Sequence, residues 1–469
     1  MIVEARAVLG ADRFVDAAIV DCRTRLESPL RLALTGTVKA GKSTLLNALV
    51  GEEIAPSDAT ECTRVVTWFV RGRSPSISMT VDGRTRNLPV ERTDGRLLLD
   101  LGDVGAERVE RLEVTWPSSL LERYTIVDTP GTASNSRDVS RRTMDLLAPA
   151  SGRCEVDAVV YLTRDLQKSD VDILAGLSSD TAAGPLGVIT VHSRADEVNG
   201  GQEWSAISER ASSSTETVPV SGLLALRGRT LRQSEFEAFR LLADDADVDR
   251  SLISVGRFAS ADGALTPDVR RALVGRFGLV GVRSAVSLVR SGVSSAPSLA
   301  DEMVIRSGLK ELQYRIDVQF GARHTQLRIF RALRVVQGLL ESRLDARSAP
   351  LLTRVDRALA EDHVSEELAV LADLHSRLSI ANSWQRSAME RILGGRGVEP
   401  VQRLGMSGAH STDDLAGTAR AAVRYWRTQL ANPLVAPAAA RAYRAAARSA
   451  EDILRAHSPV ARLRVLEHP

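Results

Sequence analysis

The chain has 469 residues, which is room for two or three domains with sizeable cores. Its formal net charge of +2 excludes a strong overall attraction to nucleic acid, so any contact with nucleic acid or a membrane would need a local patch. The three cysteines are scattered and fit no metal spacing or disulfide framework, which favours a reducing cytosol.

The first 29 residues carry apolar side chains at helical spacing and end at Ser28-Pro29, where proline disfavours a helical residue before it. They predict one helix that joins a helical neck outside the following domain. Their beginning lacks the basic and apolar regions of a signal peptide, and no uncharged apolar run in the chain reaches about 18 residues. Neither secretion by that route nor a spanning anchor is therefore expected.

Residues 30–230 predict an α/β domain. Short apolar runs alternate with helical patterns, which is typical of a mostly parallel sheet with helices on both faces. The predicted strands are 32–34, 65–70, 124–127, 158–162, 187–191 and 218–220. A turn signal at Asp82-Gly83 and the run RLEVTWP predict antiparallel edge strands between residues 74 and 115.

The run GTVKAGKST organises this domain. It lies between an apolar strand and a helical pattern, and its two glycines followed by Lys and Ser have the spacing of a phosphate-binding loop. The backbone N–H groups of such a loop converge on phosphate, and the following helix points its positive end at it. Lys42 is predicted to reach the β and γ phosphates, and Ser43 to ligate Mg²⁺. The residues assigned to nucleotide binding here are Gly36, Thr37, Val38, Lys39, Ala40, Gly41, Lys42, Ser43 and Thr44.

Two further elements are expected around the γ-phosphate. The run APSDATECTRVVTW should supply a hydroxyl that completes the Mg²⁺ shell and touches the attacking water, with Thr63 the first choice and Thr60 the second. Arg64 is a candidate for stabilising charge, or else a solvated edge arginine. The later apolar run YTIV ends in Asp128, which is expected to hold the Mg²⁺ hydration shell, and the N–H of Gly131 is expected to sense the γ-phosphate.

The next motifs favour guanine over adenine. The apolar run VITVH leads into Ser193, Arg194 and Asp196. A fixed carboxylate at Asp196 can accept from both N1–H and N2–H₂ of guanine, a donor pair that adenine lacks, although a helix cap is the alternative role. Arg194 stands where lysine is usual and is predicted to stack on the base. The backbone of Ser221 and Gly222 is predicted to cover guanine O6.

From residue 231 to 469 the strand signals stop, and helical patterns predict a neck and trunk bundle. The patterned segments are 231–243, 267–291, 297–345, 351–378, 383–393, 411–430 and 435–457. The longest apolar face, from Leu309 to Leu344, predicts one helix of about 54 Å at 1.5 Å per residue. Three acid-free stretches with arginines, 269–300, 319–338 and 437–448, are candidates for contact with an anionic membrane; packing within the bundle is the alternative.

The runs AGKSTLLNALVGEEIAPSDATECTRVVTWF, VDTPGT, SRADE and VPVSGLLALRGRTLRQSEF resemble those of the bacterial dynamin-like GTPases. More narrowly, they are similar to the isoniazid-inducible proteins of C type from mycobacteria and related actinobacteria. RFGLVGVRSAVSLVRSGV and RSGLKELQYRIDVQF extend this resemblance into the helical half. It implies a GTPase head on a helical neck and trunk, GTP-driven head-to-head dimerisation, and action on the cytoplasmic membrane under cell-wall stress. The segment Arg164–Asp170 corresponds to the region through which dynamin heads face each other.

Val38 and Lys39 depart from the eukaryotic dynamins, which carry Gln and Ser at these positions to orient water and help hold a monovalent cation. Valine cannot position water. Lys39 is a candidate to place its ammonium where related GTPases hold that cation, and the alternative is a lysine that faces solvent.

The predicted function is hydrolysis of GTP with Mg²⁺, an activity of EC 3.6.5 type, with Lys42, Thr63, Lys39 and Gly131 as the catalytic residues. GTPase-domain dimerisation would couple it to membrane remodelling or maintenance. The expected partners are a second copy or a sister dynamin-like GTPase, and the inner face of the plasma membrane, which a cytoplasmic protein would contact peripherally. The alternative, motivated by Val38, is a weakly hydrolysing GTP-gated scaffold that regulates a sister GTPase. No nucleic-acid partner is expected, because no basic aromatic-rich module is visible.

Overall fold

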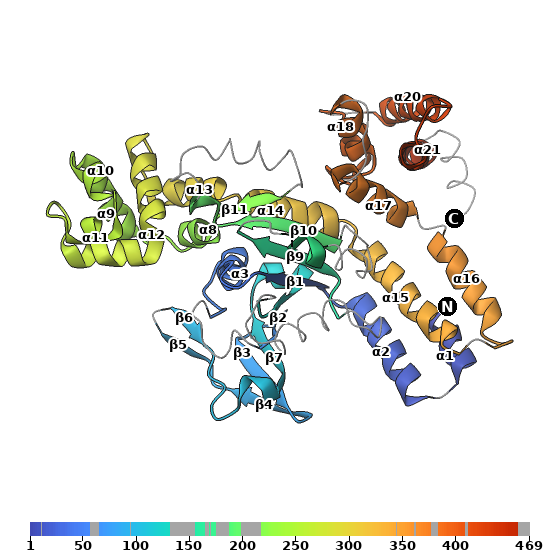
Figure 1. Cartoon of the computed structure of the whole chain (residues 1–469), viewed down its shortest axis with the longest axis horizontal. Helices are drawn as coiled ribbons and strands as arrows, with labels where there is room; N and C mark the ends of the chain where they lie inside the picture. Colours follow the sequence, from blue (N-terminus) through green and yellow to red (C-terminus); the bar gives the residue numbers. More distant parts are fainter. Residues whose placement is uncertain are drawn as a thin grey trace.

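The computed structural model describes residues 1–10, 12–56, 65–93, 95–131, 155–164, 168, 170–174, 187–197, 217–343, 345–360, 363–376, 383–408 and 411–457. A twisted sheet lies at the centre of the molecule, and helical groups flank it (Figure 1). One group, α9 to α12, lies at one end of the longest axis. The amino-terminal helices with α15 and α16 lie at the other end, and α17 to α21 gather above them.

The central sheet has nine strands in the order β11-β10-β9-β1-β8-β2-β7-β3-β4. The five strands from β11 to β8 are parallel, and β2 runs antiparallel to β8. The strands are β1 (Leu30–Gly36), β2 (Thr67–Arg71), β3 (Ser76–Val81), β4 (Arg84–Leu88), β7 (Val109–Trp116), β8 (Tyr124–Asp128), β9 (Ala158–Thr163), β10 (Val188–Ser193) and β11 (Val218–Val220). The mostly parallel sheet predicted from the sequence is confirmed.

The predicted hairpin at Asp82-Gly83 is also confirmed. Both residues have positive φ, at 50° and 71°, as a two-residue turn between antiparallel strands requires. A separate pair of short strands, β5 (Glu91–Thr93) and β6 (Arg96–Leu98), follows it. A 3₁₀ turn, η2 (Ala106–Arg108), and α4 (Ser119–Arg123) flank β7.

Side chains of β1 alternate between two cores, as a half-turn per residue requires. Leu32 and Leu34 join α3 (Lys42–Val50), α8 (Gly222–Arg229) and α14 (Leu309–Ile316) in the largest core. Ala33 faces a smaller cluster on the other face, with Val127 and Tyr161. The strand is thus covered on both sides, which explains the apolar run Leu32–Leu34 at its centre.

The helices α9 (Gln233–Asp244), α10 (Val248–Ser251), α11 (Val255–Ser260) and α12 (Pro267–Arg290) form a lobe with its own core around Phe239 and Phe277, and α13 (Ala296–Arg306) leads back to α14. Of the described helices, α12 is the one long and apolar enough to cross a membrane by length and composition. Its backbone leaves the helical region at Gly278, where φ is 67° and ψ is 165°. Its two halves are therefore separate shorter helices.

Two expectations for the helices were wrong. The single amino-terminal helix is two helices, α1 (Ile2–Leu9) and α2 (Arg13–Glu27), because Gly10 has a φ of 77° and the Asp12 carboxylate caps α2 by accepting from Phe14 N–H. The 36-residue helix is interrupted after α14 by a π-helical turn, Asp317–Gly321, before α15 (His324–Glu341) begins.

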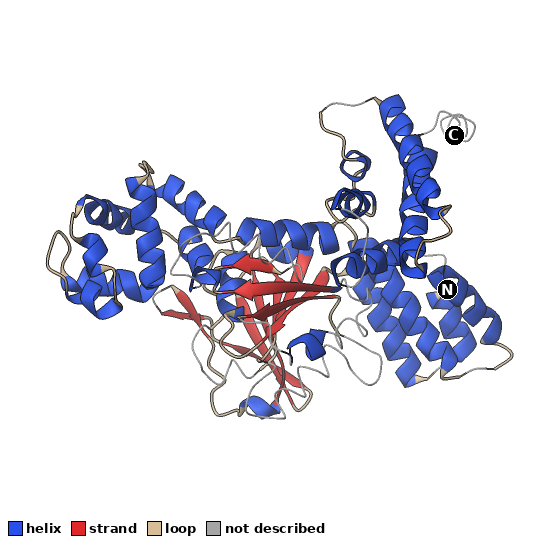
Figure 2. Cartoon of the chain, turned by 45° about the horizontal axis from the view of Figure 1, so that its top comes forward, coloured by secondary structure: helices blue, strands red, loops and turns tan. Residues whose placement is uncertain are grey.

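α1, α2, α15 and α16 (Ala349–Ala360) pack side by side around one core, and Figure 2 shows them as a bundle at one end of the sheet. The remaining helices form a second helical group. They are α17 (His363–Ser376), α18 (Ser383–Ile392), α19 (Pro400–Leu404), α20 (Thr412–Leu430) and α21 (Pro437–His457).

Candidate functional site

The phosphate loop connects β1 to α3 at the carboxyl end of the parallel strands. Its strand, β1, lies between β8 and β9, and ligands of such sheets bind at the carboxyl ends of the strands. Positive φ angles at Gly36 (138°), Lys39 (61°) and Gly41 (89°) give it the alternating backbone typical of an anion-binding nest. A Cβ on Gly36 would lie 2.0 Å from Leu162 O, so only glycine fits there. Thr37 N–H donates to the same carbonyl over 3.2 Å, which fixes the loop to β9.

The Lys42 ammonium lies within this loop. Its Nζ donates to Gly36 O over 3.4 Å and to Thr37 O over 3.2 Å. Burial lowers the pKa of the Lys42 ammonium, and the nearby Asp128 carboxylate opposes that shift. The ammonium and the amino end of α3 are both positive, so the loop favours an anion such as phosphate.

The Ser43 hydroxyl donates to Asp128 Oδ2 over 2.9 Å, which joins the start of α3 to the end of β8. Oδ1 of Asp128 is buried and has no hydrogen-bond partner within the described part of the chain. Burial raises the pKa of Asp128 to about 6, although Lys42 and the Ser43 hydroxyl lower it. A hydroxyl beside a carboxylate with a spare buried oxygen is a donor set that suits Mg²⁺ and its bound waters, so these two residues fit a magnesium site.

This pKa predicts that Mg²⁺ will bind more weakly in acid. Below about pH 6 a proton competes with the metal for Asp128, so lowering the pH from 7 to 5 should weaken Mg²⁺ binding by about tenfold. Titration of Mg²⁺ into the nucleotide-bound protein at each pH measures this. Asp128→Asn should retain only the pH dependence of the nucleotide itself, and an equal pH dependence in both proteins would contradict the prediction.

Gly131 approaches the phosphate loop closely. A Cβ at this position would lie 2.7 Å from Val38 Cγ2 and 3.0 Å from Val38 Cα. The side chain beside Gly131 is therefore a half-exposed valine, and this valine offers no hydrogen bond to a water molecule. That Gly131 N–H senses the γ-phosphate stays a prediction.

A pocket of ≈ 180 Å³ lies beside the loop, between the ends of β9 and β10 and the start of α8. Its lining residues are Ala40, Gly41, Thr44, Leu45, Leu162, Val191, Ser193, Arg194, Asp196, Glu197, Val220, Gly222 and Leu223. Part of the predicted phosphate loop and part of the predicted guanine set therefore lie around one cavity. These residues are Ala40, Gly41 and Thr44, and Ser193, Arg194, Asp196 and Gly222. A pocket lined by apolar side chains together with a few polar groups is typical of a binding site for a small molecule.

Asp196 is half-buried, and burial raises the pKa of its carboxyl group while a hydrogen bond from the Ser221 hydroxyl lowers it. The same hydroxyl accepts from Leu224 N–H and caps α8. Ser221 N–H donates to Ser307 O, so it is already used. Of the two predicted backbone donors to guanine O6, only Gly222 N–H, at the unpaired start of α8, remains suitable.

Arg194 spans the gap between the predicted base loop and the phosphate loop. Its guanidinium donates to Lys39 O over 3.2 Å and pairs with Glu197 over 2.9 Å. Glu197 also pairs with Arg164 over 2.5 Å. These contacts hold the Arg194 side chain beside the pocket. Its stacking on the base stays a prediction.

Several predicted residues lie outside the described part of the chain. Residues 57–64, with Thr60, Thr63 and Arg64, are among them. The segment 164–170 is described only in part. Within it, Asp170 is buried and accepts from Tyr161 Oη and Thr163 Oγ1 over 2.7 and 3.0 Å, so its carboxylate is used inside the domain.

Sequence reasoning missed two residues that hold the chain just before residue 57. Asn47 is buried, and its Oδ1 accepts from Ile54 N–H and Ala55 N–H over 2.9 and 2.8 Å. A lone asparagine inside the apolar helix LLNALV was the available signal. Glu53 pairs with Arg227 of α8 and Arg96 of β6 over 2.5 and 3.0 Å.

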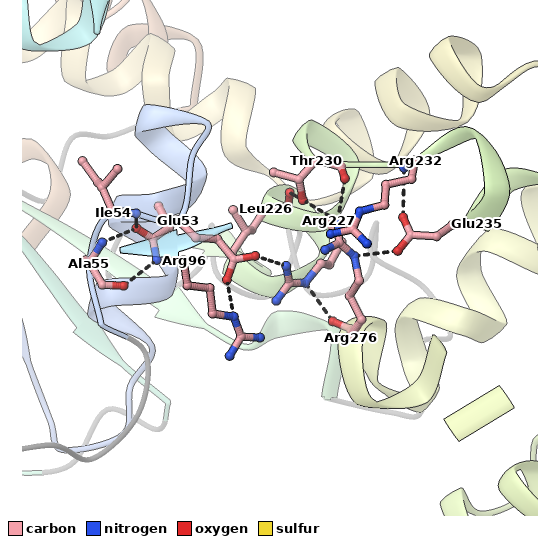
Figure 3. A network of polar contacts seen from close by, with 11 residues as sticks. Glu53, Ile54, Ala55, Arg96, Leu226, Arg227, Thr230, Arg232, Glu235 and Arg276 are labelled. Carbon is pink, nitrogen blue, oxygen red and sulfur yellow. Dashed lines mark hydrogen bonds and ion pairs between the residues drawn. The ribbon is translucent and has the colours of Figure 1, made fainter. Parts of the chain in front are cut away.

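Figure 3 shows how this contact continues toward the α9–α12 lobe. Arg227 Nε donates to Arg276 O over 2.8 Å, and the Arg276 guanidinium pairs with Glu235 over 2.7 Å. The side chains of Arg227 and Glu53 are only 6% and 10% exposed, so this ion pair is buried. A series of polar contacts therefore connects Glu53, which follows α3, to α9 and α12 through Arg227 of α8.

The family model of the Dynamin family matches residues 32–191 of the chain. Over 473 residues the chain is 40% identical to the isoniazid-induced protein IniC of Mycobacterium tuberculosis, in strains CDC 1551 / Oshkosh and ATCC 25618 / H37Rv, and the match covers 96% of both proteins. It is 28% identical over 135 residues to the bacterial dynamin-like protein of Nostoc punctiforme, covering 26% of this chain and 20% of that one.

Two solved structures are more distant. One is a chain of an oligomerised bacterial dynamin pair, with 14% identity, a TM-score of 0.34, and coverage of 99% of this chain and 76% of that chain. The other is a variant of Era from Aquifex aeolicus bound to GDP.AlF4-, with 16% identity, a TM-score of 0.20, and coverage of 41% and 50%. At these TM-scores neither structure adds support to the sequence matches.

Proposed function

The chain belongs to the dynamin family as an IniC-type dynamin-like GTPase, and from that premise we propose that it couples Mg²⁺-dependent GTP hydrolysis to remodelling or maintenance of the plasma membrane under cell-wall stress. The enzyme would be of EC 3.6.5 type. It would act in the cytoplasm, contact the inner face of the membrane peripherally, and self-associate through its GTPase domains or pair with a sister GTPase.

The strongest support for this coupling is the way β8 is held. This strand is five residues long and is tied at both ends. At its carboxyl end Asp128 accepts from Ser43 of the nucleotide site. At its amino end Tyr124 Oη donates to Asp317, in the π-helical turn of the helical half, over 2.9 Å, and Arg123 pairs with the same carboxylate over 2.8 Å. Because a short strand inside a close-packed sheet cannot absorb a displacement, a change at the metal site can reach the helices.

In the proposed reaction a water molecule attacks the γ-phosphate in line. Lys42 and the amino end of α3 would stabilise the charge that develops on the phosphate oxygens, and Gly131 N–H would donate to the γ-phosphate. Ser43 and Asp128 would hold Mg²⁺, which would neutralise charge between the β and γ phosphates. Thr63 remains the proposed residue for positioning water.

The base preference gives one prediction. Asp196→Asn replaces the carboxylate that would accept two guanine donors, so GTP should bind about 10²-fold more weakly, as expected when buried polar groups lose their partners. Competition binding against GTP and ATP measures this. Asp103→Asn, the same change at an exposed carboxylate outside the pocket lining, is the control. Unchanged GTP affinity in Asp196→Asn would contradict the assignment of the base pocket.

Lys39 gives another prediction. If its ammonium substitutes for a monovalent cation, GTP turnover should be the same, within about twofold, in K⁺ and Na⁺ buffers, because no cation site needs to be filled. Lys39→Ser should lower turnover and make it respond to K⁺. A clear K⁺ requirement in the unmodified protein would contradict the proposal.

The membrane part is tested by mixing the full-length protein with phosphatidylglycerol-containing vesicles. With GTP, electron micrographs should show vesicles that are tethered, tubulated or fragmented, and with GDP they should not. Vesicles that stay unchanged while GTP is hydrolysed would overturn this part.

The half-exposed Val38 favours a second candidate, a weakly hydrolysing GTP-gated scaffold for a sister GTPase, because valine cannot orient water. Turnover that rises only when a sister protein is added would support it.

A further inference from the structure

The three acid-free stretches differ in what their arginines do. In 269–300, Arg276 donates to Thr230 O, Arg283 to Leu252 O, and Arg290 to Ala243 O, over 2.5 to 3.0 Å. These arginines hold the α9–α12 lobe together. The guanidinium groups of these arginines already have partners within the lobe, so this stretch has few free charges for contact with a membrane.

In the second stretch, 319–338, three of the four arginines are used in the same way; the fourth, Arg334, is exposed and donates to Gln337 of its own helix. Arg323 donates to Leu393 O over 2.6 Å, and Arg328 donates to Leu26 O over 3.1 Å. Arg331 pairs with Asp157 and donates to Val156 O. These contacts connect this stretch to the end of α2, to the segment just after α18 and to the residues just before β9. The charges of Arg323, Arg328 and Arg331 are therefore used inside the protein.

The third stretch is longer than the sequence pattern suggested. Residues 415–450, which form most of α20 and α21 and the loop between them, contain six arginines and no Asp or Glu. All six side chains are exposed, and they are Arg420, Arg424, Arg427, Arg441, Arg444 and Arg448. On α20 they recur at i, i+4 and i+7, and on α21 at i, i+3 and i+7, so each helix presents them as one stripe.

Few of these charges are neutralised by the fold. Arg427 pairs with Glu451 over 2.6 Å. Within the described part of the chain, Arg420, Arg424, Arg441 and Arg444 form no ion pair and no side-chain hydrogen bond with another residue. A chain with 61 basic and 59 acidic residues therefore concentrates an uncompensated positive surface on one helical hairpin.

The loop of this hairpin, residues 431–436, holds an apolar side chain outward. Leu434 is 91% exposed and lies between Pro433 and Pro437. Asn432 orders the turn, because its Oδ1 accepts from Leu434 N–H over 3.0 Å and its carbonyl accepts from Val435 N–H over 3.3 Å. Burial of this leucine against an apolar partner would be favourable, by about 1.5–3 kcal/mol for a side chain that becomes fully buried.

Aromatic side chains lie on the helices beside this loop. Tyr425 and Trp426 are on the last turns of α20, Trp426 stacks on Tyr443 of α21 at 5.9 Å, and the Trp384 ring packs against Tyr425 at 5.2 Å. Trp384 is 58% exposed. Trp426 and Tyr443 are 2% and 6% exposed and pack inside the protein, so Trp384 is the exposed ring of this group. Tryptophan favours the boundary between lipid headgroups and acyl chains. At about 1.5 Å per residue, Arg427 and Arg441 lie within about 15 Å of the loop.

We propose that the α20–α21 hairpin is the surface by which this protein contacts an anionic lipid bilayer, with Leu434 entering the headgroup region and the arginine stripes binding acidic headgroups. This inference deepens the proposed function and rests on its membrane part. Charge complementarity selects a phospholipid surface. An exposed leucine amid exposed arginines, with Trp384 exposed on the adjoining α18, suits a surface that is anionic outside and apolar beneath.

The test is flotation of the full-length protein with vesicles made of equal parts phosphatidylcholine and phosphatidylglycerol, compared with vesicles of phosphatidylcholine alone. The double variant Arg424→Glu/Arg441→Glu should bind the anionic vesicles at least about tenfold more weakly and lose most of the salt dependence. Leu434→Asp should also weaken binding by about tenfold, with the salt dependence retained.

Matched controls come from the opposite end of the molecule. Ile253 is 63% exposed between α10 and α11, and Arg257 is exposed on α11. Ile253→Asp and Arg257→Glu should bind vesicles as the unmodified protein does. GTP turnover without vesicles should be unchanged in all four variants, which shows that they are folded.

Each outcome decides the proposal. Hairpin variants that float as well as the unmodified protein would overturn the inference and leave the membrane function standing. Loss of flotation in the control variants as well as the hairpin variants would also overturn it. An unmodified protein that binds RNA through the hairpin but no vesicle would overturn both the inference and the membrane part of the proposed function, while the GTPase assignment would remain.

Discussion

Lys42→Ala is expected to reduce GTP turnover by about 10²–10³-fold, the loss typical of removing one donor that stabilises transition-state charge. The ammonium contacts the phosphate loop through Gly36 O and Thr37 O only, over 3.4 and 3.2 Å, among the hydrogen bonds of the described residues. The fold should therefore tolerate the change. Lys42→Arg should lose activity similarly, because a planar guanidinium does not fit where a compact ammonium does.

The control for this prediction is Lys310→Ala. Lys310 is one of the chain's four lysines and lies exposed on α14. Its removal should leave turnover unchanged, and thermal unfolding should show both variants folded. A Lys42→Ala protein that hydrolyses GTP within about threefold of the unmodified protein would contradict the assignment of the phosphate site.

Glu53→Ala is expected to destabilise the protein by about 3–5 kcal/mol, because it leaves the buried Arg227 without its carboxylate. Glu122, in α4, is the control. It pairs with Arg71 over 2.9 Å, but these side chains are 48% and 59% exposed, and exposed pairs contribute about 0–1 kcal/mol. The midpoint of urea unfolding for the two variants measures the difference.

A second substitution separates charge burial from lost packing. Adding Arg227→Met to Glu53→Ala should recover part of the lost stability, because no buried charge then remains without a partner. Equal shifts for Glu53→Ala and Glu122→Ala, or a further loss in the double variant, would contradict the account of this contact.

The sheet and the nucleotide site were predictable because their signals are local. Each parallel strand is covered on both faces and is therefore an apolar run, and the phosphate loop needs glycine, lysine and serine at fixed spacing. The break between the two amino-terminal helices also has a local signal, because Gly10 followed by Asp12 is a helix end and a helix cap.

The interruption after α14 could not be predicted from periodicity. Val318 and Phe320 are buried, so the apolar pattern continues through the π-helical turn. The turn is explained by contacts across the chain: Tyr124 donates to Asp317, and a Cβ at Gly321 would lie 2.5 Å from Tyr124 Oη. The pairing of Glu53 with Arg227 across 174 residues has no sequence signal for the same reason.

The exposed hairpin loop was missed because its chemistry depends on exposure. In the sequence, Leu434 is one apolar residue among prolines and alanines, and only the structure shows that it is 91% exposed. Likewise, the arginines of 269–300 and of the hairpin look alike in composition, and their hydrogen-bond partners distinguish them.

The central claim is that GTP hydrolysis depends on association of the GTPase domains and on the membrane. The most direct test is GTP turnover per molecule as a function of protein concentration, with and without phosphatidylglycerol vesicles, with Lys42→Ala as the blank. Specific activity should rise with concentration and rise again on vesicles. A rate near the blank at every concentration, despite tight GTP binding, would contradict the claim and favour the scaffold.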